Sequence, residues 1–263
     1  MLGAIIGDIV GSRFEWHNIK TKDFELFTDD CFFTDDSVMS IAVAKSILDC
    51  QGNFDNLNAV AVQNMQALGR KYPDAGYGGH FIEWLFDDHP EPYDSYGNGS
   101  AMRVSACGFA GKNLKEVKLL SRKVTEVSHN HVEGLKGAEA TAVAIFMARN
   151  GADKHDIFEY ISDNYYELNF TLDEIRPEYE FDVTCQDSVP QAIVAFLEST
   201  SFEDAIRNAI SIGGDSDTIA AITGGIAEAY YNIPTRIKLQ ALDYLDDEMI
   251  NVLTNFEKTY HTL

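Results

Sequence analysis

Residues 211–229 read SIGGDSDTIAAITGGIAEA, and this stretch constrains the rest of the chain most strongly. Gly213 and Gly214 permit a tight turn, and Asp215, Asp217 and Thr218 then stand where an apolar helix begins. The apolar residues that follow recur at helical spacing. The stretch therefore predicts a turn, a polar helix start and a buried helix, although helix capping alone is an alternative explanation for its acidic residues.

A second stretch, FTDDSVMSIAVAKSI at residues 33–47, repeats this arrangement with Thr34, Asp35 and Asp36 before an apolar helix. Together the two helix starts offer four carboxylates and two threonine oxygens, with no sulfur or imidazole. Mg²⁺ and Mn²⁺ prefer such an all-oxygen set, whereas zinc would be expected to recruit histidine or cysteine. If the two starts converge in space, they predict a site for hard divalent cations.

The first sixteen residues, MLGAIIGDIVGSRFEW, carry glycines at every fourth position and two acids seven residues apart, Asp8 and Glu15. On a helix each set shares a face. One interpretation is that the glycines allow a neighbouring helix to pack closely and that both acids are solvated. The other is that Glu15 adds a further carboxylate to the cation site.

Helical periodicity dominates the chain and predicts an all-α protein, a single domain over residues 1–263. The clearest periodic stretches are residues 57–68, 114–127, 135–147, 189–197, 219–230 and 237–253. Two long connections, residues 71–100 and 164–184, separate helical stretches, and unstructured connections of this length are usually functional or flexible.

Glycines in the first connection suggest a ligand contact. Residues 76–79 read GYGG and residues 95–103 read SYGNGSAMR, and successive glycines expose backbone N–H groups that can cradle phosphates. Tyr96 is a candidate to stack on a base, and His129 is a candidate ligand contact. A simple turn is the alternative. Three further side chains are expected to serve the fold, Arg103 in an ion pair and Trp16 and Trp84 in packing at the core or rim.

Composition excludes several classes of function. Forty-two acidic against 20 basic residues give a net charge of −22, which repels nucleic acid and anionic lipid. The four cysteines show no CxxC pair, and no apolar run approaches the length of a membrane span. We expect a monomeric cytoplasmic protein without a signal peptide or membrane contact, in which an anionic ligand needs bound cations or backbone N–H groups.

The motifs GDIVGSRFE, TDDS, SYGNGSAMRVS, SH followed by EGLKGA, and GGDSDTIAAITGGIAEAYY together resemble the ADP-ribosylglycohydrolase family, from Gly7 to at least Pro234. This resemblance implies a single compact orthogonal helical bundle with a dinuclear metal cleft. It also implies two Mg²⁺ (or Mn²⁺) ions and hydrolysis of the bond between the distal-ribose C1″ of ADP-ribose and an acceptor. ADP-ribose or an ADP-ribosylated acceptor would be the partner.

The resemblance also assigns roles to individual residues. It implies that Thr34, Asp35 and Asp36 bind one ion, that Asp215 and Thr218 bind the other, and that Asp217 bridges them. Glu15 matches a mobile glutamate, and the general base is one of Glu15, Asp35 and Asp36. The residues implied to contact the diphosphate and adenine are Ser95, Tyr96, Gly97, Asn98 and His129. Ser37 and Ser216 stand where the family often has threonine.

Two other functions compete with this one. Some relatives keep the fold and have lost activity, so a non-catalytic ADP-ribose-binding protein is one alternative, which the intact acidic residues argue against. A metal hydrolase of a small nucleotide or glycoside is the other.

Overall fold

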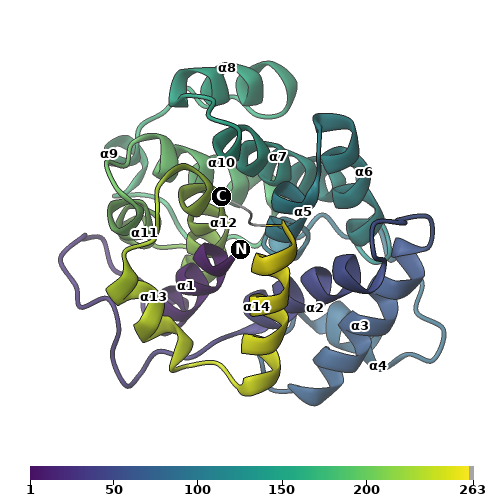
Figure 1. Ribbon diagram of the computed structural model, residues 1–263. Coiled ribbons are helices and arrows are strands. Elements are labelled where there is room, and N and C mark those ends of the chain that lie inside the picture. The colour runs from purple at the N-terminus through teal and green to yellow at the C-terminus, as the bar shows by residue number, and fades with distance from the viewer. Residues whose placement is uncertain (261–263) are drawn as a thin grey trace.

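The computed structural model describes residues 1–260, which are helical almost throughout (Figure 1). This part of the chain forms fourteen α-helices and two 3-10 turns and contains no β-strand, only an isolated bridge between Gly97 and Thr184. The all-α prediction is confirmed. The helices are α1 Leu2–Gly11, α2 Asp35–Asp49, α3 Leu57–Lys71, α4 Gly79–Phe86, α5 Ser105–Ala110, α6 Leu114–Thr125, α7 Val132–Arg149, α8 Lys154–Asn164, α9 Leu172–Ile175, α10 Cys185–Leu197, α11 Phe202–Ser211, α12 Ser216–Tyr230, α13 Thr235–Leu242 and α14 Asp247–Tyr260, and the turns are η1 Ser12–Phe14 and η2 Asn98–Ser100.

Five of the six periodic stretches correspond to one helix each, and the sixth prediction is wrong. Residues 237–253 divide into α13 and α14 around residues 243–246. There the Asp246 carboxylate accepts a hydrogen bond from the Met249 backbone N–H, at 3.0 Å, and so satisfies a donor of the first turn of α14. Among residues 1–260, no helix is both long and apolar enough to cross a membrane. The single domain over residues 1–263 stays a prediction.

Helix α1 lies in the centre of the fold and packs more extensively on α12 than any other pair of helices (Figure 1). A Cβ atom added at Gly7 would stand 2.0 Å from the Ala220 carbonyl oxygen, and one added at Gly11 would stand 2.5 Å from Cα of Asp217. The backbones of the two helices are therefore in direct contact. This confirms that the glycines of α1 allow close packing.

The same packing buries one of the two acids of the N-terminal segment. Asp8, in the middle of α1, is 0% exposed, and Glu15, just after η1, is half-buried. The expectation that both acids are solvated is therefore wrong. Helix α1 also contacts α2, so Asp8 and Glu15 lie between the N-terminal ends of α2 and α12.

We expect Gly7→Ala to lower the free energy of unfolding by roughly 2 kcal/mol or more, because the added methyl group overlaps the Ala220 carbonyl and forces the two helices apart. Urea denaturation at equilibrium measures this loss. Gly79→Ala is the matched control, since a Cβ atom at Gly79 has nothing within 4 Å. Equal stability of the two variants would contradict the close-packing argument.

Candidate active site

A cavity of about 500 Å³ opens where the ends of α1, α2 and α12 meet the two long connections. Carboxylates, aromatic rings and the glycine-rich segment, residues 95–103, all contribute to its lining. The lining residues used below are Glu15, Trp16, Asp35, Asp36, Tyr77, Phe81, Tyr93, Ser95, Gly97, Asn98, Gly99, Arg103, His129, Phe181, Val183, Asp215, Asp217 and Thr218. Every predicted site residue except Thr34 and Tyr96 is among them.

Asp8 holds in place the first aspartate motif, which is Thr34, Asp35 and Asp36 at the start of α2. Its buried carboxylate accepts hydrogen bonds from the backbone N–H groups of Thr34, at 2.9 Å, and Ser37, at 3.0 Å, and from both of their hydroxyl groups. Burial raises the pKa of Asp8 to about 6, although these hydrogen bonds act in the opposite direction. Thr34 caps α2, since its hydroxyl accepts from the Asp36 N–H while donating to Asp8. Sequence reasoning missed Asp8 because it treated this acid as solvated.

The second aspartate motif, which is Asp215, Asp217 and Thr218, follows a glycine turn, as predicted. Gly213 and Gly214 have φ angles of +72° and +74°, which favour glycine. The Asn18 side chain clamps the turn, accepting from the Gly214 N–H at 2.8 Å and donating to the Gly214 carbonyl at 2.9 Å. The turn places Asp215 at the N-cap of α12, with Asp217 and Thr218 in the first turn of the helix.

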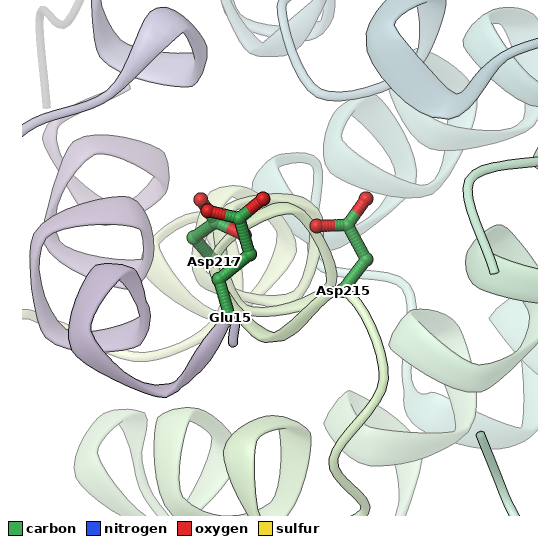
Figure 2. A group of neighbouring side chains, drawn as sticks. All are labelled: Glu15, Asp215 and Asp217. Atoms are coloured by element: carbon green, nitrogen blue, oxygen red, sulfur yellow. The ribbon is translucent and has the colours of Figure 1, made fainter. Parts of the chain in front are cut away.

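The two motifs converge in space. The Thr218 hydroxyl of α12 donates to the Asp36 carboxylate of α2 at 3.1 Å. One carboxylate oxygen each from Glu15, Asp215 and Asp217 lies within 4.8 Å of the others, and Figure 2 shows the three side chains facing one another. The other oxygen of Asp36, Oδ1, is buried and has no hydrogen-bond partner. An unpartnered buried carboxylate oxygen beside three further carboxylates fits a cation.

Burial and mutual repulsion raise the pKa values of these carboxylates. Burial raises the pKa of Asp215 to about 6, and burial together with the charges of Asp217 and Asp8 raises that of Glu15 to about 7. The pKa values of Asp35, Asp36 and Asp217 lie well above the usual range, first because of burial and then because of neighbouring carboxylates. Several buried negative charges that repel one another are stabilised by a bound cation.

The glycine-rich segment holds a carboxylate as well as lining the cavity. The Asn98 side chain donates to Asp215 at 2.7 Å and to the Ser188 hydroxyl at 3.0 Å. The Asn98 backbone N–H donates to the Val183 carbonyl at 2.8 Å, which fastens the first long connection to the second. Asn98 therefore positions Asp215 in this structure, a role that sequence reasoning did not predict.

His129 and Arg103 lie behind the glycine-rich segment. The Nδ1 atom of His129 pairs with the Ser128 hydroxyl at 2.8 Å, and Nε2 lies near Gly97 and Gly99. Burial, and next the Arg103 charge, lowers the pKa of His129 well below its ordinary value, so the ring is neutral. Arg103 donates to the Val124 carbonyl and the Ser128 hydroxyl, and no ion pair within residues 1–260 includes it. The ion-pair prediction for Arg103 is wrong.

Tyr96 lies outside the cavity lining. It is 47% exposed, and its ring packs against His131 with centroids 5.2 Å apart. The aromatic residues that line the cavity are instead Trp16, Tyr77, Phe81, Tyr93 and Phe181. The signal that could have found Tyr77, Tyr93 and Phe181 is their place in the two long connections.

The raised pKa values predict how pH affects the metal-free protein. The pKa values of about 6 for Asp215 and about 7 for Glu15 exceed their usual values of 3.8 and 4.5, so the folded state binds more protons than the unfolded chain in this range. Below the pKa values that Asp215 and Glu15 have in the unfolded chain, these groups make their full contribution to the stability of the folded state. That contribution is lost as pH rises through their pKa values in the folded state. We expect the increase in Tm on adding Mg²⁺ to grow between about pH 4 and about pH 7.5, as proton competition for the carboxylates ends.

Differential scanning calorimetry with and without Mg²⁺ measures this increase. Asp217→Asn should show a smaller dependence on pH, because it removes a charge that raises the pKa of Glu15. Asp163→Asn, an exposed change on α8, should behave as the wild type does. An Mg²⁺ effect that is constant or shrinks with rising pH would contradict the interpretation of the carboxylate cluster.

Comparison with known proteins identifies the family. The family model described as ADP-ribosylglycohydrolase matches residues 1–261. The chain is 29% identical to "ADP-ribosylhydrolase ARH3" of Xenopus tropicalis, over 94% of this chain and 91% of that protein. It is 25% identical to "ADP-ribosylarginine hydrolase Tri1" of Pseudomonas putida (strain GB-1), over 89% of this chain and 70% of that protein. A solved structure titled "ADP-ribosylglycohydrolase-related protein complex" shares its fold, with a TM-score of 0.73 at 23% identity over 98% of this chain and 95% of the other. The chain therefore belongs to the ADP-ribosylglycohydrolase family and is a hydrolase.

Proposed function

We propose that this protein hydrolyses the glycosidic bond at the distal-ribose C1″ of ADP-ribose linked to an acceptor, with two Mg²⁺ or Mn²⁺ ions as cofactors. The observation that carries the proposal is the meeting of the two aspartate motifs beside the cavity, where Thr218 bonds to Asp36 and Glu15, Asp215 and Asp217 face one another. Relatives named ADP-ribosylhydrolases supply the substrate class.

The chain's own oxygens divide into two sets of metal ligands. Thr34, Asp35 and Asp36 would hold one ion, Asp215 and Thr218 the other, and Asp217 would lie between them. Both threonine hydroxyls donate to carboxylates, Thr34 to Asp8 and Thr218 to Asp36, so each oxygen keeps a lone pair directed elsewhere. Divalent cations at such a site bind ribose hydroxyls and stabilise developing negative charge.

Glu15 is the residue we assign as general base, ahead of Asp35 and Asp36. Asp8 and Thr34 fix the start of α2, and with it the two aspartates, whereas Glu15 follows η1 and lies half-buried on the cavity wall. Its carboxylate can accept a proton from the attacking water, while the C1″ bond to the acceptor breaks through an oxocarbenium-like transition state.

The first test is metal binding and substrate profiling together. We expect calorimetry with Mn²⁺ to show that Asp217→Asn weakens binding tenfold or more, a loss of at least about 1.4 kcal/mol, because a shared ligand loses its charge. With Mg²⁺ present, the wild type should release ADP-ribose from arginine-, serine- or nucleotide-linked substrates. Asp163→Asn is the control for both measurements.

Three results would count against the proposal. Unchanged two-site binding in Asp217→Asn would remove the shared position. ADP-ribose binding without release from any linkage would favour a non-catalytic binding protein, and hydrolysis confined to small nucleotides or glycosides would favour the other alternative.

Glu15→Gln separates the general base from the metal ligands. The amide keeps the size of the side chain but cannot take a proton, so turnover should fall by roughly 10² or more, mainly through kcat. Thermal unfolding should show no loss of stability relative to the wild type, because the amide removes a charge that burial and Asp217 disfavour. Glu159→Gln, an exposed change on α8, is the matched control. Near-normal turnover in Glu15→Gln would move the general base to Asp35 or Asp36.

A further inference from the structure

A buried arginine, a serine and a histidine form a chain of hydrogen bonds behind the glycine-rich segment. The Arg103 guanidinium donates to the Ser128 hydroxyl at 2.8 Å, and the same hydroxyl pairs with Nδ1 of His129, also at 2.8 Å. Arg103 and Ser128 are fully buried, and His129 is 5% exposed. The two ends of the chain, Arg103 and His129, line the cavity. A buried cation is therefore connected to a ring at the cavity through one hydroxyl group.

The direction of these hydrogen bonds follows from what each group can donate. A guanidinium group has donors and no acceptor, so Ser128 accepts from Arg103. Because its pKa is lowered, His129 is neutral, and only one of its ring nitrogens carries a proton. If that nitrogen were Nδ1, two donors would point at one oxygen, and the buried hydroxyl proton of Ser128 would have no acceptor among the hydrogen bonds of residues 1–260. The hydroxyl therefore donates to Nδ1, and the ring proton is on Nε2.

The protonated nitrogen, Nε2, lies on the side of the ring that faces the glycine-rich segment. A Cβ atom added at Gly99 would stand 3.3 Å from Nε2, and one added at Gly97 would stand 3.7 Å from it. The two glycines line the cavity and leave Nε2 uncovered by a side chain of their own. The rings of Phe81 and Tyr93 pack on His129, with centroids 6.0 and 5.7 Å away, and limit its orientation. The ring thus presents an N–H donor toward the cavity.

The serine in this chain gives a reason for the lack of a carboxylate beside Arg103. A paired carboxylate is the ordinary way to offset the cost of a buried guanidinium charge. A carboxylate beside Nδ1 would also hold a proton on that nitrogen and leave Nε2 as an acceptor, as the aspartate of a Ser-His-Asp triad does. A hydroxyl that already accepts from Arg103 has the opposite effect, because it offers Nδ1 a donor. The absence of the ion pair therefore determines which ring nitrogen of His129 can donate.

We propose that Arg103 and Ser128 are positioning residues, which hold His129 as the Nε2–H tautomer so that the ring donates a hydrogen bond to an oxygen atom of ADP-ribose. In this role both residues act through His129. The identity of the ligand rests on the proposed function, whereas the tautomer follows from the hydrogen bonds of the chain itself.

Proton–nitrogen NMR correlation spectra of the histidine rings test the tautomer, with His129→Gln used to identify the signals of His129 among the seven histidines. We expect the wild type at neutral pH to show a neutral ring with its proton on Nε2. With Mg²⁺ present, saturating ADP-ribose should shift the Nε2 signals. A ring protonated on Nδ1 or on both nitrogens would overturn the inference, and so would Nε2 signals that bound ADP-ribose leaves unchanged.

Ser128→Ala tests the positioning role, because it removes the donor to Nδ1 and an acceptor for Arg103. We expect calorimetry to show a rise in Kd for ADP-ribose of about fivefold, the effect of one hydrogen bond whose donor is no longer held in place. The ring signals of His129 should change as well. Ser121→Ala is the matched control, since Ser121 is also fully buried but its hydroxyl has no partner, and its Kd should stay within about twofold of the wild type.

Equal Kd values for Ser128→Ala and Ser121→Ala would overturn the positioning role of Ser128. If Ser128→Ala does not fold, the spectra of the wild type alone decide the tautomer and the ligand contact. Normal ADP-ribose binding to an Nε2–H ring, without release from any linkage, would refute the proposed function and leave this inference intact. A wild type that binds no ADP-ribose would overturn both.

Discussion

The contact between the backbones of α1 and α12 determines where every charged group of the site can lie. With glycines facing Ala220 and Asp217, α1 and α12 approach closely enough for Glu15 to reach Asp217, while Asp8 on the same helix α1 reaches the start of α2. A side chain between the helices would separate these groups. The hydrogen bond from Thr218 to Asp36 depends on the same approach, since Asp8 holds the start of α2 against α1.

The electrostatics of the site follow from this geometry. Two helix N-termini point at the cluster, and their backbone N–H groups stabilise negative charge there, as when Asp217 accepts from the Thr218 N–H at 3.0 Å. That stabilisation is too small to offset burial, because the pKa values of the clustered carboxylates remain raised. An Asp36 oxygen without a partner remains as well. Under the proposed function, bound cations would supply the positive charge that these carboxylates lack, on a chain whose overall charge repels anions.

Local sequence pattern was sufficient for α2, α3, α6, α7, α10 and α12 and for the two aspartate motifs, but it did not separate α13 from α14. Capping residues and helical periodicity act over a few residues, so the starts of α2 and α12 and the glycine turn at Gly213 could be read directly. The burial of Asp8 could not, because it depends on a segment 26 residues away that supplies its donors. For the same reason the pairing of Asn98 with Asp215, 117 residues apart, had no local signal. The glycine-rich run predicts a ligand contact for Tyr96, yet the direction of a loop side chain depends on the whole connection, and the Tyr96 ring packs against His131 instead.

The lining of the cavity is uneven in charge, and under the proposed function this would orient a ligand that is anionic at one end and reacts at the other. Arg103 is the cationic residue among the described lining residues; it is fully buried and lies behind the glycine-rich segment with neutral His129. Its charge acts through a low-dielectric interior without a carboxylate paired to it, so it raises the potential on this wall more than an exposed lysine would. The carboxylates of α2 and α12 make the part of the cavity around Glu15, Asp215 and Asp217 negative. Under the proposed function, the charge of Arg103 would favour the anionic diphosphate near residues 95–103, and the carboxylates with their cations would favour the distal ribose.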